Sequence, residues 1–432
     1  MTEQAIPALP TDDEIRNLLA ERVDACRLSV GISVGITDRG QRRLISHGHC
    51  DRVRRKPVSA DTLFEIGSVT KLLTVLLLAD MAQRGEVSLD DPVSKYLPPH
   101  VSLPERDGHT IKLLHLACHT SGLPRIPRDL DVHSANPYAD YTAEKLYAFL
   151  GSCDLVRPSG VVAEYSNLGM GLLGHALAQS AGTEYETLVK ARICGALGMN
   201  ATSIALSPEA AEALATGHGD SLDPVPNWDL AVLAGAGGYR SNVRDLLTFL
   251  EALGAARSPL TEAIGIFKGS IETGGLGRLE DTPDGHSLIS HEGHTGGYNA
   301  YVGYIPEWDR GVVVLANAYP CAASDLGRHL LDPRRGDRWF RREVDVDPNQ
   351  FDRLVGSYRL TPSFILTVTR EGDRLFVQAT NQKRMRVFAA AEWHYFYKVV
   401  GAQITFEPGP DGRAARLILH QNSRDRIAVR VE

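Results

Sequence analysis

A serine and a lysine at the start of an apolar run have the types and spacing that best suit covalent chemistry. Ser68 and Lys71 lie three positions apart, and residues 72–79 are mostly apolar. On a helix, this spacing places both side chains on one face, about one turn apart. If the turn is buried, desolvation favours the neutral amine, which can take the serine proton. The pair predicts a nucleophile, Ser68, with Lys71 as its base; the alternative is a chance match between two common residues.

A tyrosine and an asparagine form a second candidate group. Tyr165 can pass a proton between nucleophile and leaving group if a nearby ammonium lowers its pKa. Asn167 can donate to a substrate carbonyl and also hold Lys71. The alternative is structural: Ser166 or Asn167 caps a helix that begins at residue 168, and Tyr165 only packs.

A glycine-rich segment, residues 291–298, ends one predicted strand and leads into the next. Gly293 would let an edge strand approach a ligand backbone closely. The backbone N–H groups of Ser68 and His294 are the predicted oxyanion hole. The alternative is an ordinary turn with solvated histidines.

The three groups stand in the order and rough spacing of a known set of motifs. The chain resembles the serine β-lactamase-like enzymes, with their S-x-x-K, Y-x-N and K/H-x-G motifs, in its class C β-lactamase, D-aminopeptidase and DD-peptidase branch (peptidase family S12). The resemblance covers about residues 12–331, and segments 90–98, 119–124 and 195–199 are similar as well. The residues that carry it are Ser68-Val69-Thr70-Lys71, Tyr165-Ser166-Asn167 and His291-Glu292-Gly293.

The resemblance implies a role for each residue. Ser68 would be the acylated nucleophile, Lys71 its base or base-activator, Tyr165 a proton relay and Asn167 a carbonyl-binding partner. His291 stands where the family has a lysine, and it would be a weaker, pH-dependent cation. This departure disfavours β-lactamase activity, because the lysine ammonium holds the β-lactam carboxylate, and it resembles the D-aminopeptidase and related peptidase or esterase members.

The function predicted is therefore a serine acyl-enzyme hydrolase that cleaves an amide or ester in a small peptide or D-amino-acid-containing substrate. The alternative is an acyltransferase, peptide cyclase or thioesterase of natural-product biosynthesis that uses the same Ser68 acyl-enzyme. A β-lactamase and a non-catalytic binding or sensor protein are further alternatives. The base for a deacylating water stays open between Tyr165, Lys71 and the substrate.

The pattern of elements predicts an α/β (α+β) fold in a catalytic domain of residues 1–332. We expect an antiparallel sheet flanked by helices, with a helical insertion at about 90–254. The predicted strands are 28–37, 42–47, 286–291, 299–305 and 311–315. The predicted helices are 12–27 (capped by Thr11), 68–85, 143–150, 168–181, 185–197, 243–253 and 323–331.

Residues 333–348 are charged and begin and end in proline, as a linker would. After them, short β-rich runs recur at about ten-residue spacing, which predicts a small antiparallel barrel at 349–432. This segment resembles the lipocalin-like domain of some family members. Such a domain would cover the acyl site; the alternative is a stability or dimerisation module.

Composition narrows the partners and the compartment. A net charge of -7 and 23% charged residues give no reason to expect nucleic acid or an anionic membrane, and the basic run at 334–342 is interpreted as a solvated linker. No signal peptide or membrane span is visible, and six cysteines without paired spacing indicate reduced thiols and the cytoplasm. No cofactor or metal is expected, since His115 and His119 lack the glutamate of a zincin; the oligomeric state is left open.

Overall fold

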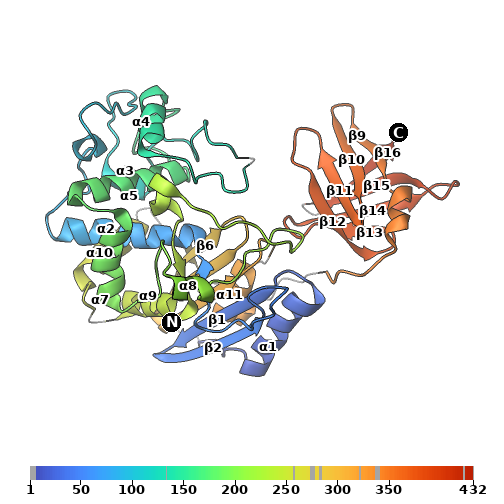
Figure 1. Cartoon of the computed structure of the whole chain (residues 1–432), viewed down its shortest axis with the longest axis horizontal. Helices are drawn as coiled ribbons and strands as arrows, with labels where there is room; N and C mark the ends of the chain where they lie inside the picture. The colour runs from blue at the N-terminus through green and yellow to red at the C-terminus, as the bar shows by residue number, and fades with distance from the viewer. Residues whose placement is uncertain are drawn as a thin grey trace.

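A six-stranded antiparallel sheet and a closed eight-stranded barrel form the frame of the part of the chain that the structure describes (Figure 1). The structure is a computed structural model, and it describes residues 6–132, 134–255, 258–272, 278–281, 285–320, 323–335, 341–421 and 424–431. The sheet has the order β2-β1-β8-β7-β6-β5. Its strands are β1 (Gly31–Asp38), β2 (Gln41–Gly48), β5 (Arg278–Asp281), β6 (Ser287–His294), β7 (Asn299–Ile305) and β8 (Arg310–Ala316).

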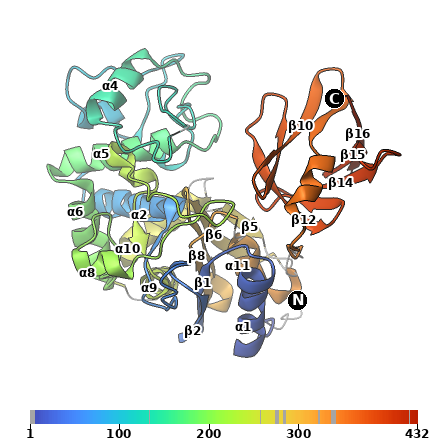
Figure 2. The same ribbon diagram turned by 45° about the vertical axis from the view of Figure 1, so that its right-hand side comes forward.

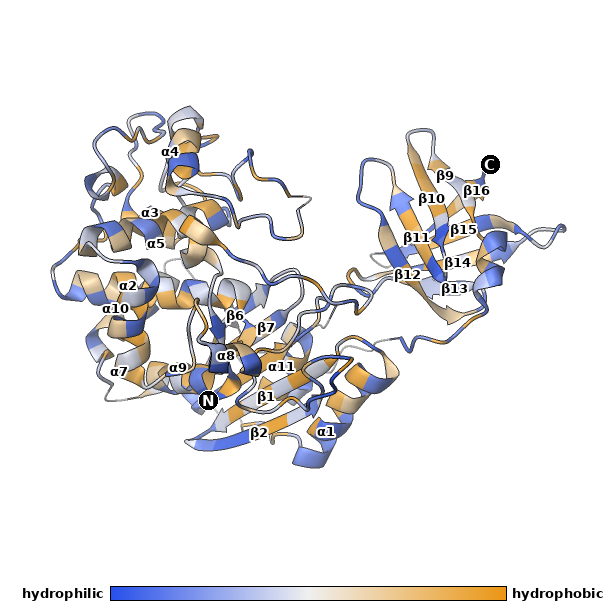
Figure 3. Ribbon diagram, in the orientation of Figure 1, coloured by the Kyte–Doolittle hydropathy of each residue, from blue (hydrophilic) through white to orange (hydrophobic). Residues whose placement is uncertain are grey.

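Side chains alternate between the two faces of the sheet, as the strand period requires. On one face, Ile32 and Val34 of β1 pack with Ile15 and Leu326. These two come from α1 (Asp12–Ala20) and α11 (Ala323–Leu331), which lie together beside the sheet in Figure 2. The other face packs against α9 (Val243–Gly254), where Leu247 contacts the backbone at Gly35. The edge strand β2 starts with polar residues, coloured blue in Figure 3, which discourage pairing with another chain.

A helical region inserted between β2 and β5 carries most of the remaining elements. It includes the short strand pair β3 (Phe64–Glu65) and β4 (Arg240–Ser241). Its helices within the described residues are α2 (Thr70–Gln83), α3 (Leu113–Ala117), α4 (Ala143–Ser152), α5 (Asn167–Ala181), α6 (Tyr185–Val189), α7 (Gly195–Leu197), α8 (Pro208–Ala213), α9 and α10 (Thr261–Glu272).

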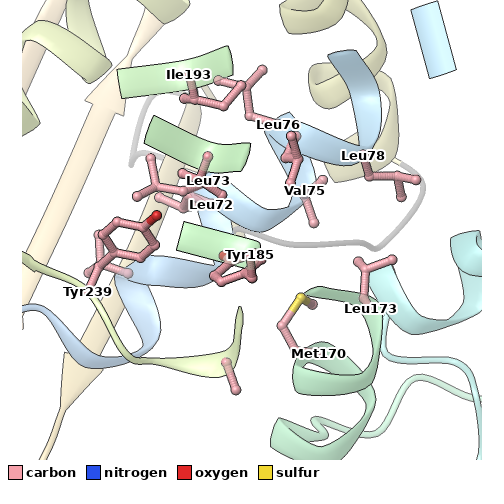
Figure 4. Close-up of a cluster of buried hydrophobic side chains, with 14 of the residues drawn as sticks. Leu72, Leu73, Val75, Leu76, Leu78, Met170, Leu173, Tyr185, Ile193 and Tyr239 are labelled. Carbon is pink, nitrogen blue, oxygen red and sulfur yellow. The ribbon is translucent and has the colours of Figure 1, made fainter. Parts of the chain in front are cut away.

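Helix α2 is the centre of the main core. Twelve of its fourteen residues are buried, so it is apolar on all sides, as expected for a helix inside a large core. Figure 4 shows leucines of α2 against Met170 and Leu173 of α5 and against Tyr185, Ile193 and Tyr239. A polar residue at the start of such a helix is taken out of water together with the apolar ones.

The barrel closes completely, because β9 pairs with both β10 and β16. Its strands are β9 (Gly356–Thr361), β10 (Phe364–Glu371), β11 (Arg374–Ala379), β12 (Met385–Ala391), β13 (His394–Phe396), β14 (Ala402–Pro408), β15 (Ala414–Gln421) and β16 (Arg424–Arg430). Every β-rich run predicted after residue 349 corresponds to one of them. Buried and half-buried positions alternate, and the inward set includes Tyr358, Ile404 and Phe406.

The predicted elements of the sheet region are confirmed, with shifted ends. The first predicted helix is α-helical only to Ala20 and continues as a π-helical turn, Glu21–Ala25. The predicted helix 185–197 contains a similar π-helical turn, Lys190–Cys194, between α6 and α7. Strand β6 runs to His294, beyond the predicted end at 291. Part of the basic run, residues 336–340, and Cys321 lie outside the described residues.

Where the structure describes the chain, none of its helices has the length and apolar character needed to span a membrane. The five cysteines that it describes form no disulfide with one another; they are Cys26, Cys50, Cys118, Cys153 and Cys194.

Candidate active site

A tight turn at the start of α2 presents Ser68. A 3-10 turn, Gly67–Val69, leads directly into α2. Gly67 has φ +48°, and a Cβ there would lie 2.7 Å from the backbone N of His294. Glycine therefore permits both the left-handed conformation and the close approach of β6. As a result, half-buried Ser68 lies between the start of α2 and the end of β6.

Lys71 is fully buried one turn after Ser68, as the spacing predicts. Its Nζ lies 2.9 Å from Ser68 Oγ and 2.5 Å from the carbonyl oxygen of Ala236. Desolvation, followed by the guanidinium of Arg125, lowers the pKa of Lys71 well below its ordinary value. A carbonyl only accepts, so Lys71 donates an N–H to Ala236. Once the amine is deprotonated, its lone pair can take the proton of Ser68.

Tyr165 completes the contacts of Ser68. Its hydroxyl donates to Ser68 Oγ at 2.8 Å. Burial raises the pKa of Tyr165 to about 12, although the hydrogen bond with Ser68 and the charge of Arg125 act in the opposite direction. The condition that a nearby ammonium lowers the tyrosine pKa is not met in the unliganded site: Lys71 lies 4.9 Å from the ring, and desolvation of the phenol outweighs the causes that lower its pKa. Tyr165 is a neutral proton donor.

The residues after Tyr165 combine the structural and the chemical interpretations of this motif. The hydroxyl of Ser166 accepts from the backbone N–H of Gly169 at 2.9 Å, so Ser166 caps α5. Asn167 Oδ1 is buried and has no hydrogen-bond partner within the described chain. The hydrogen bonds of Lys71 go to Ser68 and Ala236, so the predicted contact with Asn167 is not among them. The side chain of Asn167 instead forms a hydrogen bond with Tyr138, which lowers the pKa of Tyr138 against the larger effect of burial.

Strand β6 passes close to the turn before α2. A Cβ at residue 293 would overlap the carbonyl oxygen of Ile66 and come within 3.3 Å of Ser68 N. Gly293 is thus required by the close approach of two backbones. The backbone of His294 lies beside Gly67, next to Ser68 N, where the sequence predicts an oxyanion hole.

His291 differs from the cation that the sequence predicts. Burial, followed by the charge of Lys71, lowers the pKa of His291 to about 4. Its Nδ1 lies 2.7 Å from the carbonyl oxygen of Glu292, and since a carbonyl cannot donate, Nδ1 carries the proton. At neutral pH, Nε2 is therefore a hydrogen-bond acceptor. The expected cationic role is limited to acid pH.

His119 supports Tyr165, a role that the sequence did not reveal. Its ring lies 4.6 Å from the ring of Tyr165, and its Nδ1 accepts from the backbone N–H of Ser166 at 3.2 Å. Burial lowers the pKa of His119 to about 3, so the ring is neutral. Within the described residues, no group of three metal-ligating side chains is found.

The glycine-rich segment 235–238 has a packing role. The chain at Gly235 lies against Gly174 of α5, and a Cβ on Gly235 would come 3.1 Å from the Cα of Gly174. This approach places the carbonyl of Gly235 on Thr74 and that of Ala236 on Lys71. The segment thus positions Lys71, the proposed base.

The barrel reaches the far side of β6. The side chain of His294 is exposed there, with its ring 6.3 Å from that of Tyr319. Both residues line a cavity of about 420 Å³ whose opposite wall is the barrel segment 396–403. Ser68 is not among the lining residues of this cavity. Here the barrel borders the strand that carries the site, on the side of His294.

The fold and the site define a serine hydrolase of the β-lactamase superfamily. Residues 15–332 match the family model described as beta-lactamase, and the chain therefore belongs to that family. Residues 341–430 match a second model, a domain of unknown function (DUF3471), which corresponds to the barrel.

Curated relatives carry more than one activity in their names. The chain is 28% identical to a β-lactamase of Pseudomonas fluorescens, over 70% of this chain and 92% of that protein. It is 29% identical to the D-alanyl-D-alanine-carboxypeptidase/endopeptidase AmpH of Escherichia coli (strain K12), over 68% of this chain and 80% of that protein. It is also 25% identical to penicillin-binding protein 4* of Bacillus subtilis, over 90% and 92%.

A solved structure confirms the fold of the first region. The β-lactamase/D-alanine carboxypeptidase of Yersinia pestis superimposes with a TM-score of 0.63 at 26% identity, covering 74% of this chain and 98% of that one.

Proposed function

We propose that Ser68 forms an acyl-enzyme with the carbonyl of an amide or ester in a small peptide or D-amino-acid-containing substrate, which water then hydrolyses. The observation that carries this proposal is the position of Ser68 Oγ, 2.9 Å from a buried amine whose pKa desolvation lowers and 2.8 Å from a phenol that donates to it. A nucleophile, a base and an acid thus meet at one atom.

The proton movements balance in this arrangement. Ser68 gives its proton to Lys71 Nζ as Oγ bonds to the substrate carbon, and the carbonyl oxygen becomes an oxyanion beside the backbone N–H groups of Ser68 and His294. Tyr165 gives its proton to the leaving group as the carbon–heteroatom bond breaks, and it recovers a proton from the Lys71 ammonium. Water then attacks the acyl carbon and gives a proton to the same pair, the bond between that carbon and Ser68 Oγ breaks to release the acid, and Oγ takes the proton back.

Two features favour a peptide or ester over a β-lactam. His291 is neutral at neutral pH, so it provides no ammonium for a β-lactam carboxylate. Its Nε2 is instead an acceptor, which suits an N–H group of a peptide. The carboxypeptidase name of one relative agrees with this choice, whereas the β-lactamase name of another makes a β-lactam a necessary arm of the test.

The test is intact-mass analysis with a fluorophosphonate, followed by product analysis. We expect one adduct on the wild type and none on Ser68→Ala. Amides and esters of D- and L-amino acids, peptidyl thioesters and a β-lactam then define the substrate. Equal labelling of Ser68→Ala would refute the nucleophile, and faster turnover of the β-lactam than of any peptide or ester would refute the substrate class.

We also propose a cytoplasmic setting, which the unpaired spacing of the cysteines supports. Fractionation of cells that express the protein from its own gene tests this directly. Recovery with the periplasmic or secreted fraction would contradict it.

A further inference from the structure

The fixed positive charge near Ser68 lies on Arg125, in the loop before α5. The carbonyl of Arg125 accepts from the backbone N–H groups of Asn167 at 2.8 Å and Leu168 at 3.3 Å, which fastens the loop to the start of α5. Its guanidinium carbon lies 5.0 Å from the centre of the Tyr165 ring. The ring ends in the hydroxyl that donates to Ser68. Arg125 is therefore within about three residues of extended peptide from the nucleophile.

The guanidinium has no counter-ion within the described part of the chain. Arg125 is exposed, and no carboxylate of the described residues forms an ion pair with it. Arg157, which follows in a neighbouring loop, is by contrast paired with Glu164 at 2.9 Å. A guanidinium over an aromatic ring keeps its five N–H donors directed outward along its edge. The position is thus fixed while the donors remain available.

Desolvation disfavours the charged form of the other basic side chains around Ser68. Desolvation lowers the pKa of Lys71 well below its ordinary value, that of His291 to about 4 and that of His119 to about 3. The charge of Arg125 acts on Lys71, His119 and Tyr165. An anionic group that enters the site therefore meets its permanent counter-charge at Arg125 and not at the edge of β6.

The geometry also indicates which part of a substrate carries the anion. Tyr165 is the donor that the leaving group must approach to be protonated. Because Arg125 lies on the ring of that tyrosine, a substituent of the leaving group is brought to the guanidinium. We propose, on the basis of the proposed function, that Arg125 binds a carboxylate on the leaving group, as at the free C-terminus of a peptide. The planar guanidinium matches a carboxylate through two parallel hydrogen bonds.

Two esters with the same acyl part test this inference. Both carry N-acetyl-D-alanine as the acyl group; one has 3-hydroxybenzoate as leaving group and the other 3-hydroxybenzamide. For Arg125→Gln we expect kcat/KM for the carboxylate ester to fall about ten- to hundredfold, mainly through KM, and that for the carboxamide ester to change little. Arg125→Lys should recover part of the loss. Arg128→Gln, which removes an exposed arginine from the same loop, should leave both values unchanged.

Three results would overturn the inference. An equal loss on both esters would show that Arg125 acts through Tyr165, and an unchanged carboxylate preference would show that it does not bind the anion. A loss confined to a third ester, with a carboxylate on the acyl group, would place the anion on the wrong side. The proposed function fails separately, if the neutral fluorophosphonate does not label Ser68 in the wild type or in Arg125→Gln.

Discussion

In the catalytic region, β6 runs past the turn that carries Ser68, and a Cβ at Gly293 would overlap the carbonyl oxygen of Ile66 in that turn. In the barrel, by contrast, β9 pairs on both sides and closes the ring. The barrel keeps its apolar side chains inside this closed ladder. One strand thus positions a reactive turn through a close backbone contact, whereas the barrel strands pair with one another to form a closed module.

Of the changes in the catalytic region, Lys71→Met should have the largest effect on the rate of acylation. Methionine keeps the length of the side chain in the buried α2 but removes the base, so acylation should slow about 10²- to 10⁴-fold. The fold should persist, since replacement of a buried polar group by an apolar one of similar size costs little. The labelling rate with a fluorophosphonate and the Tm measure the two effects.

The matched control for this variant is Lys95→Met, whose side chain is 55% exposed. It should label at the wild-type rate. Acylation of Lys71→Met within tenfold of the wild type would show that the buried amine is not the base.

Gly293→Ala should disrupt the contact between β6 and the turn at Ser68. The added Cβ would overlap the carbonyl oxygen of Ile66, so the strand must move away from Ser68. A displacement of this kind costs roughly hundredfold in kcat/KM. Gly265→Ala in α10 is the control, because its Cβ would meet nothing and alanine should stabilise the helix by about 0.5–1 kcal/mol. Full activity of Gly293→Ala would mean that the close approach is not needed.

Much of this arrangement is predictable from sequence because it depends on local spacing. The one-turn separation of Ser68 and Lys71 and the alternation of the barrel strands need no knowledge of distant residues. The carbonyl of Ala236 and the guanidinium of Arg125 reach the site through packing between segments far apart in the chain. Segment 119–124, which is similar to the family, ends directly before Arg125, so the sequence indicated this loop but not the role of the arginine.

The protonation states are the part that sequence could not provide. A histidine at residue 291 is a cation or an acceptor according to its burial, and a tyrosine near a lysine is acidified only if the lysine is charged. In the structure, desolvation is the largest cause in both cases: it lowers the pKa of Lys71 well below its ordinary value and that of His291 to about 4, and it raises that of Tyr165 to about 12.

Acid should destabilise the site through its neutral histidines. The unfolded chain protonates His291 and His119 near pH 6.5, whereas the folded protein does so only near 4 and 3. The unfolded state therefore binds more protons as pH falls below 6.5, and the free energy of unfolding should decrease down to about pH 4 and continue to decrease to pH 3. Urea denaturation at pH 7, 6, 5 and 4 measures the slope.

His291→Gln should reduce this slope by up to one proton, which is about 1.4 kcal/mol for each pH unit. The reduction should appear between pH 6.5 and 4. At pH 7 to 8 this histidine does not titrate in either state, so the slope there should be unaffected. An unchanged slope would mean that His291 titrates alike in both states and that its neutral, acceptor role is wrong.

The smallest effects should come from the exposed ion pair between the barrel and the catalytic region. Arg374 of β11 forms an ion pair with Asp223 at 2.6 Å, and the two side chains are 38% and 48% exposed. Exposed pairs are worth about 0–1 kcal/mol, so Asp223→Asn should leave kcat/KM unchanged and the stability nearly so. Lys398 is different, because its side chain is only 1% exposed and its ammonium contacts Glu343 at 2.6 Å and the carbonyl of Arg27 at 2.9 Å.

Glu343→Gln would leave the Lys398 ammonium buried without its carboxylate, and the loss of one partner of a buried pair costs about 3–5 kcal/mol. Burial already lowers the pKa of Lys398, so part of this loss should be relieved by deprotonation. The buried ion pair between Lys398 and Glu343 should therefore matter more to stability than the exposed pair between Arg374 and Asp223. Equal changes in Tm for Asp223→Asn and Glu343→Gln would contradict this ranking, since burial is the feature that distinguishes the two pairs.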